Sequence, residues 1–110
     1  MREKCRYKLL HKNEIGKISL CKSCGNLRVE IGHLMSLISV EPFQLILEDF
    51  KHRYEFYQQC DAQELLEPIF ICLNKRNLFL KLSIEEFKEV LELFEVSNHM
   101  LEVDSLIFSH

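Results

Sequence analysis

The amino-acid sequence predicts an α+β fold: an antiparallel sheet built from two hairpin-rich ββα-like units, with two amphipathic helices packed on one face. Short apolar runs separated by turn residues fill the chain as far as Ile38. Helical spacing of apolar residues begins after Ser39, and the same strand-to-helix succession returns after Glu67. A length of 110 residues fits a single domain, residues 1–110.

Turn residues divide the first part of the chain into strands. Asn13-Glu14-Ile15-Gly16 is typical of a hairpin turn, and Gly32-His33 supplies another. A Cys-x-x-Cys-Gly turn lies between them. Consecutive hairpins predict a four-stranded meander whose strands are residues 5–12, 17–21, 27–31 and 34–38.

A long helix is predicted for residues 40–59. Ser39 is a suitable N-cap, and Pro42 falls in the first turn, where its missing N–H costs little. Asp61 and Glu64 suggest a further short helical turn. The apolar stripe of the long helix consists of Phe43, Ile46, Leu47, Phe50, Tyr54 and Tyr57.

The second unit follows the same plan. Residues 68–73 and 78–82 are predicted strands around a turn at 74–77. Ser83 and Glu86 form a capping-box pattern that opens a helix over residues 84–97.

An internal ββα repeat is one interpretation of this pattern. Residues 34–50 and 78–94, which are 44 positions apart, are identical at seven of 17 positions. The other interpretation is that any junction between a strand and a capped helix selects these residue types. Both interpretations require the same architecture.

Two apolar features do not fit the predicted stripes. Residues 99–110 are too apolar for a free tail, so we expect them to dock on the body of the domain or on a second subunit. Phe56 falls off the stripe of the first helix, which indicates packing under the C-terminal segment or a partner surface.

Charge is unevenly distributed along the chain. Residues 1–28 carry eight Lys or Arg and two Glu, whereas residues 29–110 carry six Lys or Arg and 15 Asp or Glu. This asymmetry favours a basic edge that lies against an acidic helix of the same molecule or of a second copy. Nucleic-acid binding is the less favoured alternative, and its candidate residues are Lys4, Arg6, Lys8, Lys12, Lys17, Lys22 and Arg28.

Several classes of protein are disfavoured. No apolar run approaches the roughly 18 residues of a membrane helix, and the N-terminus lacks the apolar segment of a signal peptide. Five cysteines, an odd number, argue against a disulfide framework. A cytoplasmic location with reduced thiols is therefore expected. The familiar catalytic motifs are absent, so an enzyme is not predicted.

Cys21 and Cys24 lie in the pattern Cys-x-x-Cys-Gly between two predicted strands, as in zinc ribbons. If the first hairpin turns about residues 13–16, Cys5 stands opposite Cys24, which makes Cys5 a third metal ligand. Three interpretations remain: structural zinc at Cys21, Cys24 and Cys5, reduced thiols without metal, or a thiol-based redox or metal sensor. A thioredoxin-type redox motif would open a helix instead.

The succession LCKSCG, LRVEIG-HLMSLIS, SVEPF, IFICL, LFLKLS and IEEFKEVLELF resembles an uncharacterised bacterial family of short proteins, a domain of unknown function. The likeness covers nearly the whole chain, and the Cys-x-x-Cys-Gly turn is its most specific element. The resemblance implies a stand-alone cytosolic domain and adds no catalytic residue. The sequence thus predicts a non-enzymatic interaction or regulatory module, with a homodimer or another protein as its partner and no membrane association.

Overall fold

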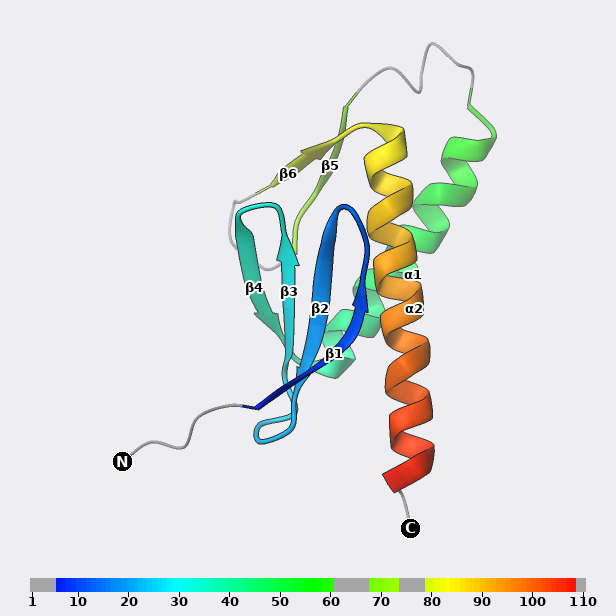
Figure 1. The fold of residues 1–110 in the computed structure, drawn as a ribbon. Coiled ribbons are helices and arrows are strands. Elements are labelled where there is room, and N and C mark those ends of the chain that lie inside the picture. Colours follow the sequence, from blue (N-terminus) through cyan, green and yellow to red (C-terminus); the bar gives the residue numbers. More distant parts are fainter. Residues whose placement is uncertain (1–5, 61–67, 74–78, 109–110) are drawn as a thin grey trace.

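The computed structural model has the predicted α+β fold, with two β-sheets and two long helices (Figure 1). It describes residues 6–60, 68–73 and 79–108, with side chains described as far as Val103. In Figure 1, α2 lies alongside the first hairpin and α1 crosses behind it. The strands form a four-stranded and a two-stranded antiparallel sheet instead of one continuous sheet.

The four-stranded sheet confirms the predicted meander, because its strands are hydrogen-bonded in the order β1-β2-β3-β4. Gly32 has a φ of +60° in the two-residue connection between the last two strands, a conformation that glycine adopts without steric cost. The strands are β1 (Tyr7–Lys12), β2 (Gly16–Cys21), β3 (Leu27–Ile31) and β4 (Leu34–Ile38).

A β-bulge in β1 corrects the predicted register of the first hairpin. His11 pairs with Ile18 as expected, but Leu9 pairs with Ser19 and Tyr7 with Cys21, so the register shifts between Leu9 and His11. The extra residue at the bulge is Leu10, whose side chain is buried in the core. The prediction that Cys5 lies opposite Cys24 assumed an unbroken register in the first hairpin. That assumption is wrong, because the register shifts at the bulge.

Helix α1 (Val40–Gln58) has nearly the predicted bounds. Ser39 occupies the N-cap position with extended backbone angles, but its side chain makes no capping hydrogen bond. Its carbonyl oxygen accepts the N–H of Phe43 at 3.1 Å. The helix therefore begins where the sequence indicates, through its backbone and not through the serine hydroxyl.

Strands β5 (Ile69–Ile71) and β6 (Leu80–Leu82) pair antiparallel in the second sheet. They lie within the predicted ranges 68–73 and 78–82 but are shorter. The predicted helical turn at residues 61–64 and the predicted turn at 74–77 lie outside the described residues.

Helix α2 (Ile84–Phe108) opens with the predicted capping box. The Ser83 N–H donates to Glu86 Oε1 at 2.9 Å, and the Glu86 N–H donates to Ser83 Oγ at 3.2 Å. The predicted end at residue 97 is wrong, because the helix continues to Phe108. No Gly or Pro interrupts the sequence between Ile84 and Phe108, and Met100 on the extension packs against the core.

Four phenylalanines join the two helices in the core. Phe43 stacks on Phe94 with ring centroids 4.7 Å apart, Phe50 meets Phe87 edge-on at 5.6 Å, and Phe50 lies 5.1 Å from Phe94. In the possible repeat, Phe43 is equivalent to Phe87 and Phe50 to Phe94, because each pair is 44 positions apart. The contacts join non-equivalent positions: Phe43 of α1 packs on Phe94 of α2, and Phe50 of α1 packs on Phe87 of α2. This exchange is the contact pattern that two repeat units related by a twofold axis would make, although the duplication itself stays a prediction.

The first hairpin is attached to α2 by a small polar cluster. Asn13 donates from Nδ2 to the Glu89 carbonyl oxygen at 2.9 Å and to Glu92 Oε1 at 3.0 Å. The same carboxylate oxygen lies 3.2 Å from His11 Nε2. Asn13 Oδ1 accepts the N–H of Ile15, so one side chain orders the turn and also holds the helix.

We expect Phe94→Ala to lower the free energy of unfolding by about 3–5 kcal/mol, because truncating a fully buried ring loses apolar burial and leaves a cavity. Urea denaturation followed by circular dichroism measures the change. Phe56→Ala is the matched control, since its ring is 64% exposed and should change stability by no more than about 0.5 kcal/mol. Equal effects of the two substitutions would show that the ring cluster does not hold the helices.

The polar cluster predicts a pH-dependent contribution to stability. Hydrogen bonds from Asn13 and then His11 lower the pKa of Glu92 below its ordinary value of 4.5. The resulting stabilisation is therefore present above the unfolded-state pKa and is lost as the pH falls through the lower pKa of the folded state. The urea midpoint of wild type should exceed that of Glu92→Gln near pH 6, and the difference should shrink towards pH 3.

Glu95→Gln, which removes a carboxylate one turn further along α2, is the control for the change in net charge. A difference between wild type and Glu92→Gln that stays constant down to pH 3 would contradict the role of the ionised Glu92 carboxylate.

Candidate functional site

The cysteine turn between β2 and β3 has the local geometry that the sequence predicts. Gly25 adopts a φ of +78°, and its N–H donates to the Cys21 carbonyl oxygen at 2.9 Å. The N–H of Cys24 points at Cys21 Sγ at 3.4 Å. The turn thus places a backbone N–H donor against the sulfur of Cys21.

The described residues supply only part of a metal site. Cys21 is buried and Cys24 is exposed, while Cys5 lies outside the described residues. Across the described part of the chain, no group of three or more His, Cys, Asp or Glu side chains is placed to hold a metal ion. A structural zinc needs four ligands, so zinc at Cys21, Cys24 and Cys5 stays a prediction.

A redox role finds little support in the location of the turn. The two cysteines lie between strands, so they lack the helix N-terminus that lowers the thiol pKa in thioredoxin-type sites. None of the four described cysteines, Cys21, Cys24, Cys60 and Cys72, forms a disulfide.

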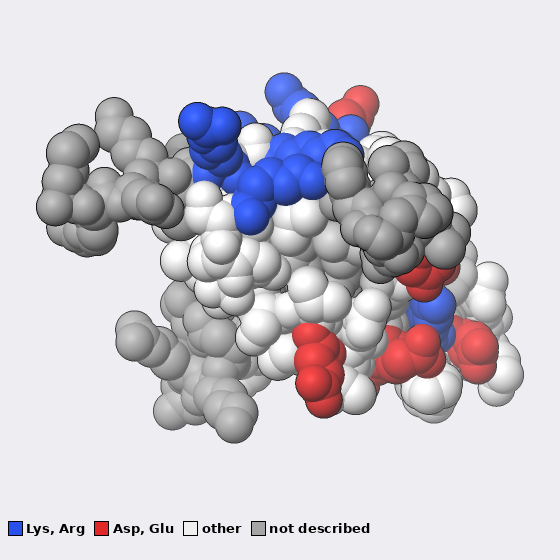
Figure 2. Space-filling view, turned by 90° about the horizontal axis from the view of Figure 1, so that it is seen from below, with Lys and Arg blue, Asp and Glu red and all other residues white. Residues whose placement is uncertain are grey.

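The basic residues gather on one side of the molecule. Figure 2 shows Lys and Arg mainly along one side of the view and Asp and Glu mainly along the other. Two of the predicted nucleic-acid contacts already have acidic neighbours, because Arg28 Nε lies 2.8 Å from Glu30 Oε1 and Lys17 Nζ lies 3.7 Å from Glu30 Oε2. The contact between Arg28 and Glu30 is an ion pair without a hydrogen bond, because the Nε–H of Arg28 does not point at the carboxylate oxygen. Lys4 lies outside the described residues.

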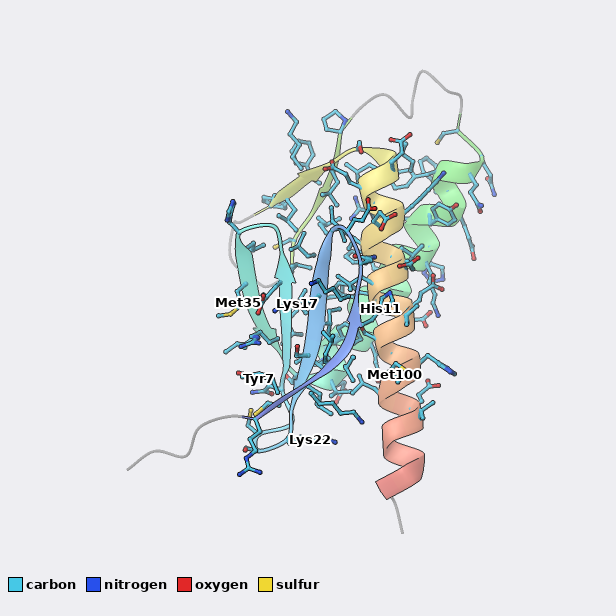
Figure 3. The ribbon with its side chains drawn as sticks, in the orientation of Figure 1. Tyr7, His11, Lys17, Lys22, Met35 and Met100 are labelled. Atoms are coloured by element: carbon cyan, nitrogen blue, oxygen red, sulfur yellow. The ribbon has the colours of Figure 1, made fainter. Side chains whose placement is uncertain are left out.

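The outer face of the four-stranded sheet carries exposed apolar side chains. Cross-strand pairing aligns Leu9, Ser19, Arg28 and Leu37 in one row, and paired residues project from the same face of a sheet. The alternate residues of β3 are buried beneath the other face, so this row points away from the core. Figure 3 shows Met35 projecting away from both helices. The exposed fractions are 36% for Tyr7, 51% for Leu9, 56% for Met35 and 58% for Leu37.

A cation-π contact confirms that Tyr7 shares the outer face. The guanidinium of Arg28 lies 3.9 Å from the centroid of the Tyr7 ring. The charged residues Arg28 and Glu30 thus lie between two apolar margins of the sheet. One margin consists of Tyr7 and Leu9 on β1, and the other consists of Met35 and Leu37 on β4. We call these four apolar residues together the outer patch.

The outer patch was not predicted from the sequence. A signal was present, because the run Leu34 to Ile38 has apolar residues at both of its outward positions. A strand that is apolar on both faces is normally covered on both faces. The polar cluster of Asn13 and Glu92 had no such signal, since its members are 79 positions apart.

Comparisons with models of protein families, with curated proteins and with solved structures found no match to this chain. The resemblance to an uncharacterised bacterial family therefore stays a prediction. In the described part of the chain, no helix is both long enough and apolar enough to cross a membrane.

Proposed function

We propose that this chain is a non-catalytic protein-interaction module that works as a homodimer. The observation that carries the proposal is the outer patch: Tyr7, Leu9, Met35 and Leu37 are exposed on a sheet face that the core does not use. The solvent face of an antiparallel sheet is normally polar, so exposed apolar side chains on both margins of this face favour a surface that binds another protein.

The charge distribution supports a second copy as the partner. The outer face carries both signs, with Lys17 and Arg28 beside Glu30, and in the view of Figure 2 basic and acidic side chains lie mainly on opposite sides. A surface that carries both signs can meet its own copy with opposite charges opposed. The assignment as non-catalytic rests on the sequence, which contains no recognised catalytic motif.

A structural metal in the cysteine turn is a second proposal, and the contact of the Cys24 N–H with Cys21 Sγ favours it. Cys21, Cys24 and Cys5 would hold zinc with a fourth ligand from elsewhere in the chain or from a second copy. Such a zinc would fix the end of β2 against the start of β3. Reduced thiols also suit a cytoplasmic location, which we propose for the protein.

Native mass spectrometry and light scattering test the homodimer. Wild type should have twice the 13.1 kDa mass of the chain, with the dimer fraction rising with concentration. Leu37→Lys should raise the dimer dissociation constant by about tenfold or more, because it places a charge in the outer patch. Phe56→Lys, at a residue of α1 that is 64% exposed, is the matched control and should leave dimerisation unchanged.

A monomer at the highest soluble concentration of wild type would contradict the proposal. The same spectra test the second proposal separately, because a bound zinc adds its mass to each chain and Cys24→Ser should remove it. Protein that carries no zinc after refolding with zinc present would overturn the metal proposal and leave the homodimer proposal standing.

A further inference from the structure

We draw no further inference here: the strongest candidate, the pocket between α1 and α2 that is lined by Glu41, Glu48 and Glu102, is a cluster of acidic side chains at which nothing in the structure shows what would bind.

Discussion

The contact between α1 and α2 through buried aromatic rings determines the rest of the arrangement. Phe50 touches both Phe87 and Phe94, so the two helices form one unit that the sheets pack against. The inward residues of the four-stranded sheet, such as Ile18 and Val29, are fully buried in the same core. The described helices occupy one side of this sheet, and on its opposite face Leu9, Met35 and Leu37 are exposed whereas Ser19 is buried. The outer patch is a consequence of that one-sided packing.

The position of α2 also explains why the two sheet edges differ. This helix contacts β1 and β2, and the bond network from Asn13 to Glu92 holds the first hairpin against it. One helix cannot lie along both edges of a twisted four-stranded sheet, and α2 contacts mainly the side that carries β1 and β2. The most apolar strand of the sheet, β4, thus lies at the other edge of the sheet, with Met35 and Leu37 exposed.

Local features of the fold were predictable from the sequence because they depend on nearby residues. The meander follows from its turns, the start of α2 from the reciprocal bonds of Ser83 and Glu86, and the cysteine turn from the positive φ available to Gly25. The length of α2 was not predicted, because apolar residues beyond position 97 suggested a separate docked segment. In fact they continue an uninterrupted helix.

The candidate site was less accessible from sequence, because it depends on contacts between distant segments. The bulge at Leu10 could not be seen in two consecutive leucines, and it removes the register on which the pairing of Cys5 with Cys24 depended. The exposure of Leu37 depends on which sheet face the helices cover, and that is decided by packing far along the chain.

Amide hydrogen exchange measured over a range of protein concentrations tests the central claim, dimerisation through the outer patch, most directly. The account predicts that exchange in β1 and β4, the strands that carry the outer patch, slows as concentration rises, because a second copy covers them and stabilises the sheet. Exchange around Phe56 on α1, which lies outside the outer patch, should not change. Exchange in β4 that stays constant over a range in which the measured mass doubles would contradict the account.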